Sequence, residues 1–431
     1  MSRSKLLPFE LLAQIFMEGF RADQKYRCST RPRTHNKPEF RDVVTWVCHA
    51  WRVAALGTPQ LWSSIVINSH RSYVSYVRYI ARADPKRPLD IYLGLNSRFL
   101  KDVAAKTGMK LWEAVTDIMH DLAHYGAPDR WRTLNIRVGR PGLMPPNFTG
   151  TLALLPLRNL DSFTWLGYRD PEITIDDELE RLDCDRLILK SSRLRSVHFR
   201  GFLLGYIVEQ GRASVFSNLT CLELGLEDGV PRIAQICSVL RQNPNLQTFR
   251  IALGNGGYSM SPDDYYPNPE VVKLPFLQEF SLERGRGALW VKPLLLSISA
   301  PAVTKLRITI TNVDWGVWDI LPACLVEGVD GRPMFHALSH FVTNLPVEPL
   351  EDILRAYPRL ERLDLTSREH PQKATPSTLQ GLLPMVPRLT HLRVNREWYL
   401  NAEELVLAIE QAGTTAPKVD ITRTDYAHYF I

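Results

Sequence analysis

Two stretches near the start of the chain carry apolar residues with the 3.6-residue period of amphipathic helices. The first opens with Leu7-Pro8-Phe9-Glu10, and its predicted buried positions are 11, 12, 15, 16, 19 and 20. Pro8 suits the first turn of a helix, where the N–H groups have no intrahelical partner. The second stretch repeats the rhythm at positions 44, 47, 48, 51, 54 and 55. We predict two or three short helices, with a core too small to be stable without a partner surface.

A different pattern repeats through the rest of the chain. An L-x-x-L-x-L frame, with apolar substitutes, recurs with first residues at Trp131, Leu160, Leu194, Leu219, Leu246, Leu277, Val303, Leu338, Leu360 and Leu389. The mean spacing of about 29 residues lies at the upper edge of leucine-rich-repeat spacing. Helices are predicted between the strands, starting at Pro231, Pro349, Ser377 and Asn401. This alternation predicts an α/β fold, a divergent leucine-rich-repeat solenoid with a parallel sheet inside and helices outside.

The segment between the two patterns mixes both periods. Leu89 to Leu93 alternates like a strand, whereas Ser72 to Ala83 and residues 99–125 are helical in pattern, with Gly108 as an interruption. We therefore divide the chain at residues 1–66, 67–126 and 127–431.

The first apolar stretches also carry a specific order of residues. Leu7-Pro8 with Glu10-Leu11-Leu12 is followed by Ile15-Phe16, Val47-Cys48, Trp51, and Thr58-Pro59 with Leu61-Trp62. This order resembles an F-box, in the F-box-like form found ahead of leucine-rich repeats in many fungal proteins. The resemblance covers residues 1–66 and departs from the family in a long polar insertion at 21–42.

The resemblance implies a non-catalytic subunit that docks onto the Skp-type adaptor of an SCF-type cullin–RING ubiquitin ligase and recruits an unknown protein substrate for degradation. The residues expected to form the adaptor contact or the F-box core are Leu7, Pro8, Leu11, Leu12, Ile15, Val47, Trp51, Leu61 and Trp62. The sequence alone does not divide them between these two roles.

Substrate binding is expected on the inner, concave face of the sheet, because residues between the leucines point away from the core. The candidates are His198, Arg200, Glu223, Arg250, Glu279, Glu283, Lys305, Arg307, Arg362, Asp364, His391 and Arg393. Their mixed signs favour a protein partner over nucleic acid, which would need a mostly basic stripe. For any one of them, an ordinary solvated strand position is the alternative.

Charge is unevenly distributed along the chain. The net charge is +6, but residues 1–110 hold 19 Lys and Arg against 8 Asp and Glu. The insertion contributes seven of these cations, Arg41 among them. A solvated loop explains them, and a contact with nucleic acid or an acidic protein is the alternative.

No catalytic, metal or cofactor motif is evident. His120 and His124 have the spacing of a zinc protease, but Asp121 replaces the required Glu and no third ligand stands out. Six scattered cysteines indicate a reducing compartment, and no apolar run reaches the length of a membrane span, so we expect a cytoplasmic or nuclear protein. A repeat scaffold without ligase recruitment and a nucleic-acid-associated protein remain the alternatives to a ligase subunit.

Overall fold

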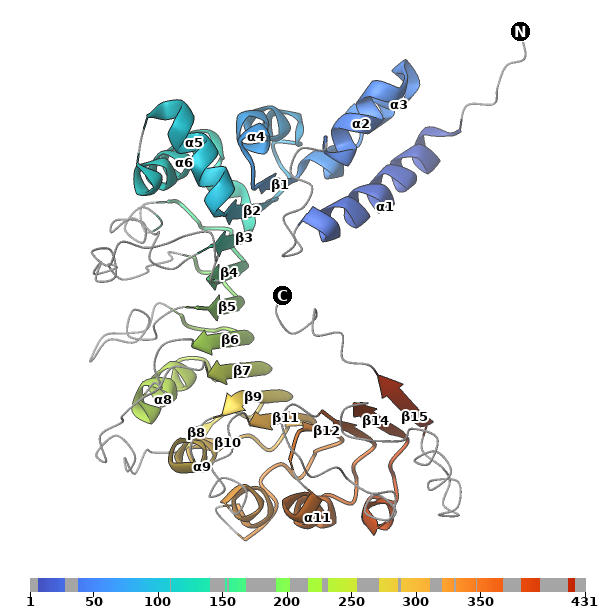
Figure 1. Cartoon of the computed structure of the whole chain (residues 1–431), viewed down its shortest axis with the longest axis vertical. Helices are drawn as coiled ribbons and strands as arrows, with labels where there is room; N and C mark the ends of the chain where they lie inside the picture. The colour runs from blue at the N-terminus through green and yellow to red at the C-terminus, as the bar shows by residue number, and fades with distance from the viewer. Residues whose placement is uncertain are drawn as a thin grey trace. The chain divides into compact units, whose positions relative to one another are not determined.

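The structure is a computed structural model of the chain. It describes residues 7–27, 38–108, 110–139, 152, 155–167, 191–201, 216–226, 232–253, 271–285, 288–310, 320–328, 331–345, 347–366, 381–395 and 418–422. The chain's internal contacts divide it into two compact units, with the boundary between Leu194 and Arg195. Figure 1 traces both units by colour from the N-terminus to the C-terminus.

The first unit opens with short helices. They are α1 (Phe9–Arg27), α2 (Phe40–Val47), α3 (His49–Leu56) and the 3-10 turn η1 (Pro59–Trp62). The Pro8 carbonyl accepts the first helical hydrogen bond, from the Leu12 N–H at 3.1 Å, so α1 begins where the sequence predicts. Cys48 has an extended backbone and separates α2 from α3, which breaks the second predicted helical stretch in two.

The structure corrects the predicted bounds of the polar insertion. Helix α1 continues to Arg27 and α2 starts at Phe40, so the predicted insertion at 21–42 is helical at both ends, while residues 28–37 lie outside the described part of the chain. Gly19 allows these helices to pack closely, because a Cβ at that position would overlap the ring of Phe40.

A parallel sheet follows in the same unit. Its strands, in spatial order, are β1 (Ser64–Ile67), β2 (Leu89–Leu95), β3 (Trp131–Val138) and β4 (Ser162–Gly167). The connections contain α4 (His70–Arg82), α5 (Ser97–Thr107), α6 (Leu111–Tyr125) and the 3-10 turn η2 (Pro128–Arg130). Gly108 ends α5 with a φ of 72°, as its position in the sequence predicts. The sheet therefore begins at Ser64, ahead of the first predicted repeat frame at Trp131.

The second unit is also built on a parallel sheet. Its strands, in spatial order, are β5 (Ser196–Arg200), β6 (Cys221–Leu226), β7 (Thr248–Leu253), β9 (Glu279–Gly285), β11 (Lys305–Ile310), β12 (His340–Thr343), β13 (Arg362–Leu365), β14 (His391–Asn395) and β15 (Lys418–Thr422). Its helical elements are α8 (Ile233–Arg241), α9 (Ala288–Leu296), the π-helical turn η7 (Ala323–Glu327), α11 (Val347–Ala356) and the 3-10 turn η8 (Leu383–Met385). A short parallel ribbon, β8 (Val272–Lys273) with β10 (Ile298–Ser299), completes it.

The apolar positions of the repeat frames form the core of the second unit. Leu222, Phe249 and Phe280 are register partners on β6, β7 and β9, and all three are buried. Helices α8, α9 and α11 lie on one side of the sheet (Figure 1). Each of the ten predicted frames leads into a strand, so the predicted α/β leucine-rich-repeat architecture is confirmed.

The predicted helices are found where the structure describes them. Helix α8 buries Ile233, Ile236, Cys237 and Leu240 as the pattern indicates, and Pro349 lies in the first turn of α11. Of the helix predicted at Ser377–Met385, the described end is α-helical at Gly381 and Leu382 and continues into η8. The helix predicted from Asn401 lies outside the described residues.

Candidate protein-interaction surfaces

Only some of the apolar side chains of the N-terminal helices are buried in their small core. Leu12, Phe16 and Phe20 form the buried stripe of α1. Facing them, η1 places Leu61 and Trp62 in the interior, where the Trp62 indole N–H donates to the Ala55 carbonyl at 2.9 Å. This pairing satisfies the polar end of a buried tryptophan.

The structure divides the nine residues of the F-box-like motif into two groups. Leu12, Leu61 and Trp62 are core residues. The exposed group is Leu7, Pro8, Leu11, Ile15 and Val47. Trp51 is intermediate, with its ring 5.1 Å from that of Phe16. The prediction that positions 11, 15, 47 and 48 are buried is therefore wrong, because the stripe at 12, 16 and 20 is wide enough to close this small core.

Nine large apolar side chains on these helices and on the segment that leads into α1 are exposed. We call this set the N-terminal apolar face; it consists of Leu7, Phe9, Leu11, Ile15, Val43, Trp46, Val47, Val53 and Leu56. Leu11 and Ile15, one turn apart on α1, are 46% and 48% exposed. So many exposed large apolar side chains within one short segment favour a protein-binding site.

Arg41, which the sequence places among solvated loop cations, is completely buried. Its Nε donates to Glu39 Oε2 at 2.7 Å, and its Nη1 donates to the Ser64 carbonyl at 2.8 Å. The guanidinium also stacks over the ring of Tyr79, 3.6 Å from the centroid. Arg41 thus connects α2 to β1 and α4, and the expectation of a solvated side chain is wrong because carbonyls, a carboxylate and a ring replace its water.

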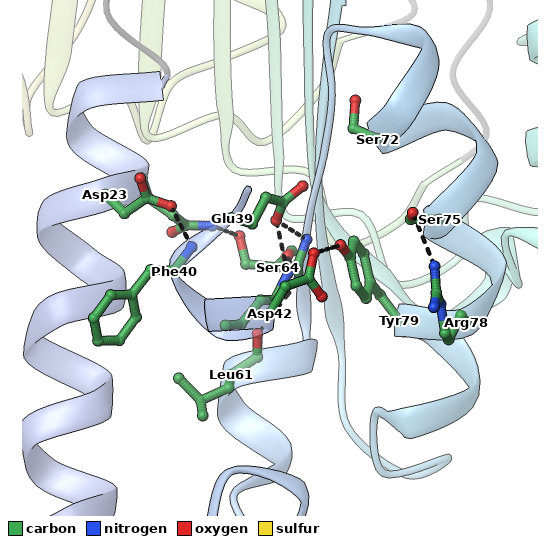
Figure 2. A network of polar contacts seen from close by, with 12 residues as sticks. Asp23, Glu39, Phe40, Asp42, Leu61, Ser64, Ser72, Ser75, Arg78 and Tyr79 are labelled. Carbon is green, nitrogen blue, oxygen red and sulfur yellow. Dashed lines mark hydrogen bonds and ion pairs between the residues drawn. The ribbon is translucent and has the colours of Figure 1, made fainter. Parts of the chain in front are cut away.

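Neighbouring polar contacts extend this network (Figure 2). The Tyr79 hydroxyl donates to Asp42 Oδ2 at 2.7 Å, and the Phe40 N–H donates to Asp23 Oδ2 at 3.1 Å. Burial raises the pKa of Tyr79 well above its usual value. The phenol therefore stays protonated, and its O–H group is the donor of the hydrogen bond to Asp42. These contacts hold the N-terminal helices against the first strand of the sheet.

The second surface is the inner face of the second unit, where register brings charged side chains together. His198, Glu223 and Arg250 are direct partners across β5, β6 and β7. His198 Nδ1 lies 2.8 Å from Glu223 Oε2, and Arg250 Nη1 donates to Glu223 Oε1 at 2.7 Å.

The same series of ion pairs continues onto the next two strands. Arg250 Nη2 donates to Glu279 Oε1 at 3.0 Å, and Lys305 Nζ lies 2.9 Å from the same oxygen. We call the five residues from His198 through Glu223, Arg250 and Glu279 to Lys305 the charge ladder. Basic and acidic side chains alternate from strand to strand, so each of the two carboxylates lies between two basic residues.

The ladder keeps its carboxylates ionised. Burial alone would raise the pKa of Glu223, but the hydrogen bond and charge of His198 and the charge of Arg250 outweigh it and hold the pKa below its usual value. Burial would likewise raise the pKa of Glu279, and the hydrogen bond from Lys305 with the charge of Arg250 lowers it instead.

A second polar cluster lies further along the face. Arg362 Nε donates to Asp364 Oδ1 at 3.0 Å, and His340 Nε2 lies 3.4 Å from Asp364 Oδ2. Burial alone would raise the pKa of the Asp364 carboxyl, but hydrogen bonds from His340 and Arg362 hold it below its usual value. The sequence reasoning missed His340 because its frame, Leu338 with Phe341, is a degraded copy of the repeat.

The remaining candidates are not part of either cluster. Arg307 Nε lies 3.8 Å from Glu283 Oε1, and Arg200 lies against Gly225, where a Cβ would meet its side chain. His391 and Arg393 lie exposed on β14. The structure therefore brings together seven of the twelve predicted inner-face residues in these two clusters: His198, Glu223, Arg250, Glu279, Lys305, Arg362 and Asp364. Binding of a substrate there stays a prediction.

Cys221 also belongs to the inner face, and the sequence reasoning missed it. It lies two residues before Glu223, so both side chains point to the same side of β6. Ligand atoms of His198, Cys221 and Glu223 all lie within 4.8 Å of one another. Burial raises the pKa of the Cys221 thiol. The alternation of the strand was the signal that could have placed Cys221 beside Glu223.

The two histidines with zinc-protease spacing lie at the surface of the first unit. His120 and His124 are both exposed on α6, and the carboxylate of Asp121 between them accepts a hydrogen bond from the Tyr73 hydroxyl. Across the described ranges, none of the helices combines the length and the apolar character that crossing a membrane requires.

No protein-family model matches the sequence, and no curated protein matches it. Among solved structures, the leucine-rich-repeat-containing protein LegL7 from Legionella pneumophila is similar with a TM-score of 0.40 and 11% identity, over 84% of this chain and 90% of that one. A protein from Bacteroides fragilis has a TM-score of 0.36 and 13% identity, over 79% and 76% of the two chains. The TLR13–ssRNA13 complex has a TM-score of 0.38 and 15% identity, over 72% of this chain and 40% of that one.

Proposed function

We propose that this chain is the substrate-recognition subunit of a cullin–RING ubiquitin ligase. Its N-terminal helices bind the Skp-type adaptor, and the inner face of its second unit binds the target protein. One observation carries the proposal: the F-box-like motif separates into a closed core and an exposed set, and the exposed set is Leu7, Pro8, Leu11, Ile15 and Val47. A motif that served folding alone would bury these side chains.

The energetics favour a protein partner for the N-terminal apolar face. Complete burial of a Leu or Ile side chain contributes about 1.5–3 kcal/mol. The half-exposed side chains of this face therefore offer several kcal/mol to a partner, against the entropic cost of association. The exposed part of these side chains adds no stability to the isolated chain.

The N-terminal helices are attached to the sheet of the first unit, which supports a role in positioning a bound adaptor. Arg41 joins α2 to β1, and Tyr79 of α4 joins Asp42 of α2, so the N-terminal helices are fixed to the first strands of their own unit. An adaptor bound to the apolar face would be held in a defined orientation to these strands. A ligase subunit acts by such proximity and orientation and needs no bond chemistry of its own.

The experiment is co-purification of the full chain with a Skp-type adaptor. We compare wild type with the double variant Leu11→Glu/Ile15→Glu, which places charges on the α1 side of the apolar face. The matched control is Val74→Glu/Val77→Glu on α4, because these valines are also exposed, at 64% and 43%. All four positions are at the surface, so both variants are expected to fold, which circular dichroism checks.

The proposal predicts that wild type and the α4 control retain the adaptor and that the α1 variant loses it. If none of the three proteins binds the adaptor, the ligase role is wrong and the chain is a repeat scaffold. If the α1 variant binds as well as wild type, the N-terminal apolar face is not the docking site.

A further inference from the structure

His198, Cys221 and Glu223 have the arrangement of a metal site. They come from two adjacent parallel strands, with His198 directly across from Glu223, and Cys221 two residues before Glu223 on the same side of β6. Their ligand atoms lie within 4.8 Å of one another. Zn²⁺ bonds of about 2.0–2.3 Å in a tetrahedron separate ligand atoms by roughly 3.3–3.8 Å, so small side-chain rotations bring the three donors onto one ion.

From this geometry we propose that His198, Cys221 and Glu223 bind one Zn²⁺ ion on the inner face of the second unit. The donor set selects the metal. A thiolate sulfur, an imidazole nitrogen and a carboxylate oxygen are all zinc ligands, whereas Mg²⁺ and Ca²⁺ take oxygen ligands almost exclusively. The proposal concerns binding and does not depend on the proposed function.

The groups around the three ligands form an outer shell. Ser196 Oγ lies 2.8 Å from His198 Nε2 and orients the ring so that Nδ1 faces Glu223. Arg250 Nη1 binds Glu223 Oε1 and leaves Oε2 for the metal. Ligating histidines and carboxylates typically make such hydrogen bonds through their other atom. The ion would replace the hydrogen bond between His198 Nδ1 and Glu223 Oε2.

The charges at the site also balance. One thiolate and one carboxylate neutralise a divalent cation. Arg250, the cation that faces the site from β7, is held on its other side by Glu279 at 3.0 Å, and Lys305 lies beyond that carboxylate, 2.9 Å from it. Three protein ligands leave the fourth tetrahedral position to water or to a donor from a bound partner. The site is reachable, since the side chains of His198 and Glu223 are 28% and 30% exposed.

The test uses the metal-free full chain titrated with Co²⁺, which takes the place of Zn²⁺ and absorbs light. A tetrahedral site gives visible absorption, and a cysteine ligand adds a near-ultraviolet thiolate-to-cobalt band. We expect both signals to saturate at one equivalent and to disappear when Zn²⁺ is added. Cys221→Ser is expected to abolish the thiolate band, and Ser196→Ala to weaken affinity by about tenfold through loss of the outer-shell contact.

The matched control is Cys48→Ser, because Cys48 is an exposed cysteine in the first unit. It is expected to leave the thiolate band unchanged, and circular dichroism verifies that each variant is folded. The proposal is overturned if wild type at saturating Co²⁺ shows no thiolate band, or if the band persists in Cys221→Ser. Metal bound only at surface histidines gives no thiolate band and so counts against it.

Discussion

Arg41 shows how a single residue can decide the stability of the N-terminal helices. A buried guanidinium is tolerated only where ion pairs and hydrogen bonds replace its hydration. Here Glu39 supplies the charge, the carbonyl of Ser64 accepts one N–H, and Tyr79 provides a ring face. Removal of the cation leaves Glu39 buried without its partner.

We predict that Arg41→Met destabilises the first unit by about 3–5 kcal/mol, the usual cost of breaking a buried ion pair. Thermal unfolding combined with hydrogen exchange over α1 to α4 measures the effect and locates it. The matched control is Arg21→Met, whose exposed pair with Glu18 contributes about 0–1 kcal/mol. Equal, small effects of the two substitutions would contradict this account of Arg41.

Tryptophans illustrate what the sequence could and could not predict at this scale. The motif predicts Trp51 and Trp62 as adaptor or core residues, and truncation of a buried tryptophan costs about 3–5 kcal/mol. Of these two tryptophans, Trp62 is fully buried, so the full cost is expected for Trp62→Ala. Trp51 is partly exposed beside Phe16, so Trp51→Ala is expected to lower the free energy of unfolding by less. Residue type and helical period do not distinguish two tryptophans whose burial depends on how three helices meet.

At the scale of elements, strands such as β6, β7 and β11 have an apolar side in the core and a mostly polar side on the inner face. Some polar side chains are linked from strand to strand: His340 of β12 lies 3.4 Å from Asp364 of β13, which also accepts a hydrogen bond from Arg362 on its own strand. Such links stabilise the sheet only while the carboxylate is ionised.

The lowered pKa of Asp364 gives a pH prediction. A carboxylate whose pKa falls on folding contributes stability above its unfolded value, roughly pH 4, and loses it as the pH falls through the lower folded value. We therefore expect Asp364→Asn to lower the unfolding temperature at pH 7, and the difference from wild type to shrink progressively below about pH 4.

Thermal unfolding of both proteins across this pH range measures the difference. The control is Asp352→Asn on α11, where the pair with Arg355 is exposed and the expected difference is small at every pH. A difference for Asp364→Asn that stays constant down to pH 2 would rule out its carboxylate as the source.

Most strands of the sheet were predictable at this scale, whereas β1, β15 and some helices were not. The leucine frame is a local pattern, so each copy can be recognised in the sequence without knowledge of its spatial neighbours. Each of the ten frames leads into a strand. Helix α9 was not predicted, because Pro293 lies inside it and proline disfavours a helix interior. Glu223 was predicted because it lies between the two leucines of its frame, Leu222 and Leu224, whereas Cys221 precedes them and was missed.

At the scale of the whole molecule, the chain presents a different kind of surface on each of its two units. The first unit carries the N-terminal apolar face, suited to burial against a partner helix or groove. The second carries the charge ladder, whose alternating signs lack the continuous basic stripe of a nucleic-acid groove. Two chemically distinct surfaces are what a subunit needs to hold two different proteins at once.

Hydrogen exchange of the full chain, alone and with a saturating Skp-type adaptor, tests the central claim most directly. We predict slower exchange in residues 7–15 of α1 and its lead-in and in residues 43–56 of α2 and α3. Exchange in α4 and in strands β5 to β14 is predicted to stay the same. Protection of the inner-face strands with no change in α1 to α3, or no protection at all, would contradict the assignment of the N-terminal apolar face as the adaptor site.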